Sequence, residues 1–236
     1  MLAEGATVTS AATRPSGRVM IVVSSGATRA TIAKARLPAF RDRPFVIAAD
    51  GGLDAAIGLG YGVDVVVGDL DSVDLQQLAE LGPDVVVELA ARDKDETDLE
   101  LAMRAAIARG ANAILVLDSA RGRVDHFLAT SLLYCHADFR DVEIGACIDG
   151  ARIAVVHAGL ARTFEVTPGS TVTLLPINGE ADGVTTDGLA FALDHETLRP
   201  SSTRGVSNIA VQPSYSISLL SGTLLVIEPE PEAGHE

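Results

Sequence analysis

Acidic residues follow several apolar runs in the first half of the sequence, and their carboxylates are the side chains best suited to chemistry. They belong to Asp50, Asp69, Asp71, Asp95, Asp98 and Asp125. Two carboxylates about 4 Å apart repel by about 4 kcal/mol at an effective dielectric constant near 20. Several of them facing one crevice need a counter-charge, and an oxygen-only ligand set favours Mg²⁺ over Zn²⁺. The motifs therefore predict a magnesium site.

The same motifs indicate a phosphorylated ligand. Mg²⁺ held by one or two carboxylates usually completes its shell with substrate phosphates. Predicted helix N-termini after Arg123 and Asp95 would also favour an anion. The sequence contains no GxxxxGK[ST] motif, and no GxGxxG motif opens the first unit, so the P-loop and Rossmann interpretations are disfavoured. We expect a magnesium-dependent enzyme acting on a phosphate or nucleotide.

Alternating strand and helix patterns are expected to position these carboxylates. The predicted strands cover residues 18–24, 45–49, 63–67, 84–89, 113–117 and 142–148, and the predicted helices cover residues 30–36, 51–59, 75–81, 99–109 and 124–136. This alternation is typical of an α/β domain with a mainly parallel sheet and helices on both faces. Ligands of such sheets bind beyond the carboxyl ends of the strands, where the acidic motifs fall.

The pattern changes after Gly150 to short strands separated by turns. These strands are predicted at residues 152–156, 163–166, 171–175, 189–193, 216–220 and 223–227. The fold class is therefore an α/β N-terminal domain followed by an all-β C-terminal domain, most simply a sandwich. The predicted divisions are a disordered extension over 1–17, the α/β domain over 18–150, the β domain over 151–228 and an acidic tail over 229–236.

Composition excludes some functions. With 18 basic and 32 acidic residues the formal net charge is −14, which disfavours nucleic-acid binding through a basic surface. The apolar runs are far shorter than the roughly 20 residues of a membrane span. Cys135 and Cys147 form no CxxC pair and are interpreted as reduced core thiols. The first residues do not resemble a secretory signal, so we expect a cytoplasmic protein with no nucleic-acid or membrane partner.

The ordered motifs DGG, GDLDS, KDETD, GRVDH, TTDGLAF and GVSN resemble the thiamine pyrophosphokinase (thiamin diphosphokinase) family, from about Arg18 to Ile227. The resemblance implies an ATP- and Mg²⁺-binding catalytic domain followed by a thiamine-binding β-sandwich. It implies transfer of a diphosphate group from ATP to the hydroxyethyl oxygen of thiamine, with release of AMP. It also implies a homodimer with active sites between the subunits.

The resemblance further implies which residues form the site. Mg²⁺ would be bound by Asp69, Asp71 and Asp98. The nucleotide would contact Asp50, Gly51, Lys94, Asp95, Thr97, Arg123, Asp125 and His126, with Asp50 also able to support the metal cluster. Thiamine would contact Thr97, Asp98, Phe191, Ser207 and Asn208. Catalysis would depend on Asp71, Asp98 and Arg123, with Arg123 adding a fixed positive charge and Asp71 or Asp98 accepting the hydroxyl proton.

Departures from the family pattern keep alternatives open. Phe191 stands where Tyr or Trp is common, and Ile209 stands where an acidic residue often follows Ser-Asn. Both changes concern the thiamine side, so one alternative is a related diphosphokinase for another hydroxymethyl heterocycle, such as a pterin. Another is a non-catalytic sensor of a nucleotide or of thiamine diphosphate. In a purely structural interpretation, Asp95 is the N-cap of the following helix.

Overall fold

The computed structural model describes residues 18–29, 40, 42–121, 123–159 and 161–230. The predicted extension over 1–17 and the predicted helix over 30–36 lie outside the described residues, as do residues 231–236 of the predicted tail. None of the helices in the described part of the chain is long and apolar enough to cross a bilayer.

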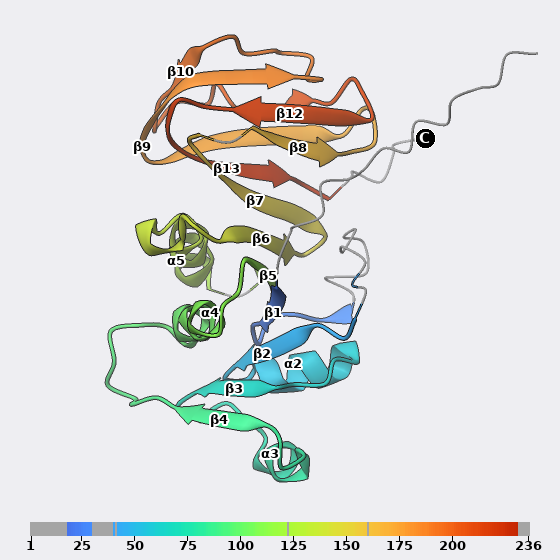
Figure 1. Ribbon diagram of the computed structural model, residues 1–236, viewed down its shortest axis with the longest axis vertical. Coiled ribbons are helices and arrows are strands. Elements are labelled where there is room, and N and C mark those ends of the chain that lie inside the picture. The colour runs from blue at the N-terminus through green and yellow to red at the C-terminus, as the bar shows by residue number, and fades with distance from the viewer. Residues whose placement is uncertain (1–17, 30–39, 41, 122, 160, 231–236) are drawn as a thin grey trace, which may run out of the picture.

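The N-terminal part is a parallel sheet with the order β4-β3-β2-β1-β5-β6 (Figure 1). Its strands are β1 (Val19–Val23), β2 (Phe45–Ala49), β3 (Val65–Gly68), β4 (Val86–Leu89), β5 (Ala113–Asp118) and β6 (Glu143–Ile148). The described helices are α2 (Gly52–Leu59), α3 (Leu75–Glu80), α4 (Asp98–Ala108), α5 (Val124–Leu133) and the 3₁₀ turn η1 (Ala137–Phe139). The central strands β1 to β3 are rich in β-branched residues and buried on both faces, as in parallel sheets generally. The predicted mixed α/β architecture of this part is therefore confirmed.

Helices cover both faces of the parallel sheet. On one face, Met103 of α4 packs with Met20 and Ile114 of the sheet, and Tyr134 and Phe139 complete this core after α5. On the other face, Leu53 and Ala56 of α2 pack against Ile21 and Val46. Burial of these apolar side chains, worth about 1.5–3 kcal/mol for each large one, fixes where each helix begins relative to the strand ends.

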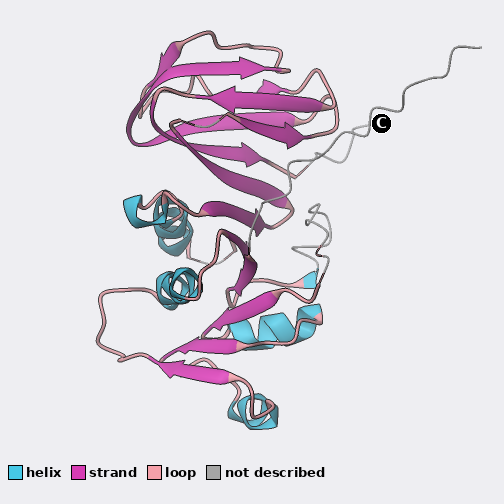
Figure 2. Ribbon diagram, in the orientation of Figure 1, coloured by secondary structure: helices cyan, strands magenta, loops and turns pink. Residues whose placement is uncertain are grey.

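The C-terminal part is rich in strands, as predicted, and Figure 2 shows no helix in it. Its strands are β7 (Ala151–His157), β8 (Arg162–Glu165), β9 (Thr171–Asp187), β10 (Glu196–Leu198), β11 (Asn208–Ile209), β12 (Ser214–Ser218) and β13 (Ser221–Glu228). A tight turn at Asp149 and Gly150, both with positive φ, joins β6 to an antiparallel β7. The sheet thus continues past residue 150 as β6-β7-β13-β9-β12-β8, and the predicted domain boundary there stays a prediction.

β9 is much longer than the strand predicted over 171–175. It pairs with β13 along Thr173–Ile177 and with β12 along Thr185–Asp187. Between these stretches Asn178, Gly179 and Gly183 have positive φ, so the chain bends without leaving the sheet. The strand predicted over 189–193 is wrong, because in this segment only Leu189 makes an isolated bridge, to Ala210.

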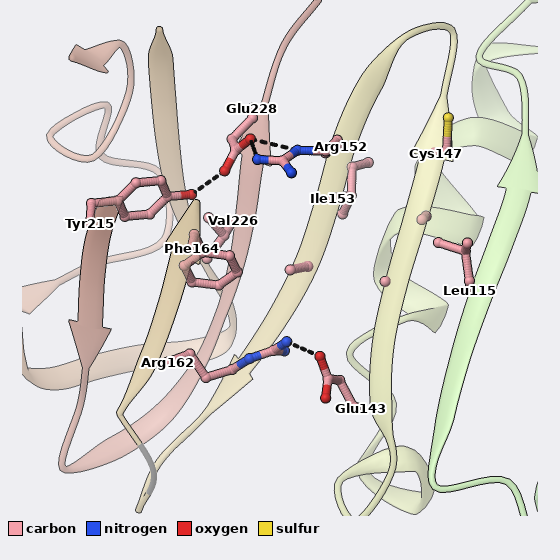
Figure 3. A pocket seen from close by; sticks show the side chains of 13 residues that line it. Leu115, Glu143, Cys147, Arg152, Ile153, Arg162, Phe164, Tyr215, Val226 and Glu228 are labelled. Atoms are coloured by element: carbon pink, nitrogen blue, oxygen red, sulfur yellow. Dashed lines mark hydrogen bonds and ion pairs between the residues drawn. The ribbon is translucent and has the colours of Figure 1, made fainter. Parts of the chain in front are cut away.

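An ion pair between the two parts, and a second one within the β-rich part, lie beside a cavity of about 280 Å³ (Figure 3). Arg162 of β8 pairs with Glu143 of β6. The carboxylate of Glu228 accepts hydrogen bonds from Arg152 Nε at 2.7 Å and from the Tyr215 hydroxyl at 2.7 Å. The charges that face this cavity are thereby paired within the chain, which favours a structural role for them.

Candidate active site

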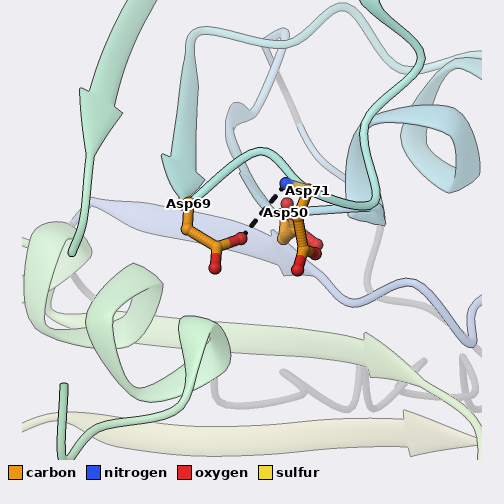
Figure 4. Close-up of side chains that lie close together, drawn as sticks. All are labelled: Asp50, Asp69 and Asp71. Atoms are coloured by element: carbon orange, nitrogen blue, oxygen red, sulfur yellow. Dashed lines mark hydrogen bonds between the residues drawn. The ribbon is translucent and has the colours of Figure 1, made fainter. Parts of the chain in front are cut away.

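Three of the predicted acidic side chains converge at the carboxyl ends of β2 and β3 (Figure 4). Asp50, Asp69 and Asp71 each offer a carboxylate oxygen, and these oxygens lie within 4.8 Å of one another. Asp50 directly follows β2, while the other two follow β3, which is its neighbour in the sheet. We call these three residues the acidic cluster. Their gathering at one sheet edge follows from the strand pattern, whereas their metal-binding role stays a prediction.

The loops that carry the acidic cluster have unusual backbone conformations. Asp50 has a φ of 46° and Leu70 a φ of 62°, values that residues other than glycine seldom adopt. A Cβ on Gly68 would lie 2.9 Å from the Cβ of Asp50, so glycine is needed where β3 ends beside Asp50. The Asp71 N–H donates to Asp69 Oδ1 at 3.1 Å, which orients the loop after β3.

The cluster is incompletely neutralised by the described residues. Asp50 is only 8% exposed, and its Oδ1 atom is buried without a hydrogen-bond partner among them. The guanidinium of Arg92 lies 3.7 Å from Asp69 and 3.8 Å from Asp71 but is largely exposed. A buried carboxylate oxygen without a partner is costly. This donor set of hard oxygens therefore fits Mg²⁺.

Asp98 lies beside the acidic cluster but outside it. Its Oδ1 accepts a hydrogen bond from Lys94 Nζ at 2.7 Å, and this bond raises the pKa of Lys94. A Cβ on Gly68 would lie 3.2 Å from the same oxygen, which places Asp98 next to the end of β3. The proposal that Asp98 completes the metal site stays a prediction.

The helix cap assigned to Asp95 is wrong. Thr97 is the N-cap of α4, and its Oγ1 accepts from the Glu100 N–H at 3.2 Å, while Asp95 is exposed in the preceding turn. Thr97 has the extended backbone of a capping residue, which leaves Asp98 and Glu100 in the first turn, where acidic side chains favour the helix dipole.

A cleft of about 870 Å³ adjoins the acidic cluster through Asp50. Of the predicted site residues, those that line it are Asp50, Thr97, Asp98, Arg123 and His126. Its walls come from the ends of β1, β2 and β5 and from α4 and α5, the strand-end crevice expected for this sheet. The cleft is large enough to hold a small-molecule substrate.

Arg123 and Asp125 form a local pair at the start of α5. The Arg123 guanidinium binds the Asp125 carboxylate, and these hydrogen bonds lower the pKa of Asp125 to about 2. Both side chains are exposed, and Arg123 is the N-cap of the helix. Arg123 therefore places a guanidinium near the helix N–H groups at the cleft mouth, and the Asp125 carboxylate offsets its charge. The helix N–H groups themselves favour an anion.

The glycine pair that follows Asp50 has a local structural reason. Gly51 is the N-cap of α2, and a Cβ on Gly52 would lie 2.0 Å from the Val23 carbonyl oxygen. Glycine is thus required for α2 to begin against β1. Among the described residues, the cleft lining does not include Gly51, so its predicted contact with the nucleotide stays a prediction.

The predicted thiamine-binding residues of the β-rich part lie away from this cleft. Asn208 is buried, and its side chain bonds both the Phe191 carbonyl oxygen, at 2.7 Å, and the Phe191 N–H, at 3.0 Å. This clamp presents the Phe191 ring, which is 67% exposed. Ser207 has a φ of 59° and donates its N–H to Thr173. In the described part of one chain, Phe191, Ser207 and Asn208 are not brought to the acidic cluster.

Sequence reasoning missed several residues near the site. Asp118 ends β5 and Ser24 follows β1, and both line the cleft. The signal for Asp118 was available, because it follows an apolar run just as Asp50 does. Arg92 and Asn178 carry no local signal: the first approaches the acidic cluster from the loop after β4, and the second reaches the cleft from β9.

Two family models match this chain, one over its N-terminal part and one over its β-rich part. Residues 38–146 match the model "Thiamin pyrophosphokinase, catalytic domain", and residues 162–224 match "Thiamin pyrophosphokinase, vitamin B1 binding domain". A comparison with curated protein sequences finds no significant match.

Solved structures share the fold. Thiamine pyrophosphokinase from Bacillus subtilis has a TM-score of 0.75 at 22% identity, covering 90% of this chain and 99% of that one. The Geobacillus thermodenitrificans protein has a TM-score of 0.73 at 23% identity, covering 91% and 99%. That from Candida albicans has a TM-score of 0.66 at 14% identity, covering 90% and 89%. Because the two family models together span well over half of the 236 residues, the chain belongs to the thiamin pyrophosphokinase family.

Proposed function

We propose that this protein is a magnesium-dependent thiamine diphosphokinase that converts ATP and thiamine to AMP and thiamine diphosphate. The observation that carries the proposal is the acidic cluster beside a strand-end cleft, in a chain that matches both the catalytic and the vitamin B1 binding models. In this reaction the hydroxyethyl oxygen of thiamine bonds to the β-phosphorus of ATP. The bond from that phosphorus to the bridging oxygen of the α-phosphate breaks, and AMP leaves with the electron pair.

The acidic cluster would hold Mg²⁺ through Asp50, Asp69 and Asp71, with Asp98 adjacent. When bound, the ion neutralises phosphate charge and polarises the phosphorus–oxygen bonds. The chain itself mainly positions the reactants, because phosphoryl transfer needs little covalent work from the protein. Thr97 contributes by fixing the start of α4, which places Asp98 at the cleft wall.

Two side chains have proposed roles in charge and proton movement. Arg123, at the N-terminus of α5, stabilises charge on the phosphates. Asp98 accepts the proton of the thiamine hydroxyl, because it lines the cleft and lies outside the acidic cluster, whereas Asp71 belongs to the cluster. The Lys94 ammonium, bonded to one oxygen of Asp98, holds that carboxylate in place. Lys94, Asp95, Asp125, His126 and Gly51 are proposed to border the nucleotide.

We propose that the active unit is a homodimer with each site shared between subunits. Helix α5 supports this, because Val124, Leu128 and Leu132 are all more than half exposed and recur every four residues along one face. An exposed apolar stripe of this kind marks an interaction surface. The partner's β-rich part, a β-sandwich in this proposal, would then supply Phe191, Ser207 and Asn208 to the thiamine end of the cleft.

Product identification tests the function. Purified protein is incubated with ATP, Mg²⁺ and thiamine, and the products are separated by chromatography. We expect AMP and thiamine diphosphate in equal amounts, and no product when EDTA removes the metal. Formation of ADP and thiamine monophosphate would contradict diphosphate transfer. Turnover of a hydroxymethyl pterin but not of thiamine would identify the related diphosphokinase, and tight binding without turnover would identify a sensor.

A cytoplasmic location is also proposed. Both cysteines are free and buried. Burial raises the pKa of the Cys135 thiol to about 12 and that of Cys147 to about 11. Thiols held in the protonated form react slowly, and free thiols are typical of reducing compartments.

A further inference from the structure

The cleft has a polar wall to which the reaction as proposed gives no role. In the strand order β2-β1-β5-β6, the chain runs from β1 to β2 on one side and from β5 to β6 on the other. The crevice between β1 and β5 is therefore a topological switch point, where open α/β sheets bind ligands. Ser24, Ser25 and Gly26 line it on one side, and Asp118 and Ser119 on the other. A Cβ on Gly26 would lie 2.9 Å from the Ser119 Cβ, so glycine lets the two loops approach closely.

Asp118 is the ionisable side chain of this crevice. It is 9% exposed, and burial raises the pKa of its carboxyl. It accepts hydrogen bonds from the Ser24 side chain and the Ser119 backbone. A carboxylate has about four acceptor sites. Asp118 therefore retains capacity for further donors from the cleft.

Its position relative to the acidic cluster indicates which donors these are. Strand β1 alone separates β2, which Asp50 directly follows, from β5, which ends at Asp118. At about 4.8 Å per strand the two positions are about 10 Å apart, within reach of a nucleotide whose phosphates lie at the cluster. A carboxylate accepts hydrogen bonds and repels phosphate, so it suits the neutral sugar. Beyond it, Phe127 and Leu133 of α5 give the cleft an apolar wall suited to a base.

We propose that Asp118 binds the ribose hydroxyl groups of the nucleoside triphosphate and thereby selects ribonucleotides as diphosphate donors. This inference rests on the proposed function, since it takes the phosphates to lie at the acidic cluster. Adjacent 2′- and 3′-hydroxyls can donate to the two carboxylate oxygens, and Ser24 on the opposite loop holds the carboxylate in position.

Substrate analogues combined with Asp118→Asn test the proposal. Wild-type protein is expected to use ATP with a kcat/KM about tenfold above that for 2′-deoxy-ATP or 3′-deoxy-ATP, the loss expected for a hydrogen bond to a charged group. Asp118→Asn keeps the shape of the side chain and removes a buried charge, so it is expected to fold. It should lower kcat/KM for ATP about tenfold while leaving the deoxy analogues nearly unchanged. The matched control is Asp84→Asn, in the exposed turn before β4, which should keep the wild-type preference.

The outcomes separate the inference from the proposed function. If Asp118→Asn still prefers ATP over both deoxy analogues by the wild-type ratio, the ribose assignment is overturned. If the variant instead loses discrimination between ATP and ITP, Asp118 reads the adenine amino group and the assignment is equally overturned. If wild-type protein shows no turnover, the proposed function fails. The inference is then decided by competition of ATP and 2′-deoxy-ATP against a fluorescent ATP analogue, in which the variant must again lose the ribose preference.

Discussion

Asp71 belongs to the acidic cluster, and replacing it tests whether its charge is needed for activity rather than for stability. Asp71→Asn keeps the size of the side chain but removes a ligand charge, so we expect turnover with ATP and thiamine to fall at least about a hundredfold. The melting temperature should stay the same or rise, because the change relieves repulsion with Asp50 and Asp69. Steady-state AMP release and thermal unfolding are the two measurements.

Asp74, three positions further along, is the control, because its replacement should lower stability and not activity. Asp74 is the N-cap of α3, where its carboxylate accepts from the Gln76 N–H at 2.8 Å. Asp74→Ala should lower the free energy of unfolding by about 0.5–2 kcal/mol and leave turnover unchanged. Wild-type turnover in Asp71→Asn, or equal losses of turnover in both variants, would remove Asp71 from the site.

At the residue scale, the sequence predicts where a side chain lies in the fold better than it predicts which side chains it contacts. Asp50, Asp69 and Asp71 could be placed at one edge because parallel strands end together. The Lys94 hydrogen bond to Asp98 and the approach of Arg92 depend on loop conformations that no local pattern encodes. Asp118 was predictable by the same strand-end argument that identified Asp50, and only the lack of a neighbouring motif hid it.

At the scale of elements, the junction of β2 and α2 depends on one glycine. A Cβ at Gly52 would lie 2.0 Å from a backbone oxygen of β1, which cannot move without breaking the sheet. Gly52→Ala should therefore lower the free energy of unfolding by about 3 kcal/mol in urea denaturation. It should also weaken activity, because Asp50 immediately precedes this junction.

Gly58, in the same helix, is the matched control. A Cβ there meets nothing within 4 Å, and the residue is exposed. Gly58→Ala should stabilise the protein by about 0.5–1 kcal/mol, since alanine favours the helix. Equal effects of the two substitutions would show that close approach to β1 does not determine the need for glycine at position 52.

The same scale shows where strand prediction fails. Runs of β-branched residues identified the N-terminal strands. The runs in the central strands β1 to β3 are buried on both faces, whereas the run in β4, at the sheet edge, is largely exposed. The 17-residue β9 was predicted only at its start, because Gly179 and Gly183 interrupt its apolar alternation while the sheet continues through them. The segment over 189–193 has strand-like composition, yet the buried Asn208 side chain holds its Phe191 backbone in a turn instead.

At the scale of the whole molecule, the change in sequence pattern at Gly150 marks a change from parallel to antiparallel pairing. It does not mark a break in the sheet, because β7 pairs with β6 and β13 pairs with both β7 and β9. Such pairing joins residues far apart in sequence, so it could not be predicted from local periodicity. Continuity of the sheet fixes the β-rich part relative to the cleft, and it holds Phe191 away from the acidic cluster of the same chain.

That separation leads to a test of the shared site by subunit complementation. Asp71→Asn should disable the acidic cluster, and Phe191→Lys should repel the thiamine cation from the β-rich part, so each variant alone should be nearly inactive. If the two residues serve one site from different subunits, co-expressed variants form mixed dimers in which one site has both wild-type residues. Random assembly then restores about a quarter of the wild-type activity. If both residues serve a site within one chain, no mixed dimer contains an intact site and the mixture stays inactive. Differently tagged chains, purified sequentially for the mixed dimer, make the two outcomes distinguishable in a single AMP-release assay.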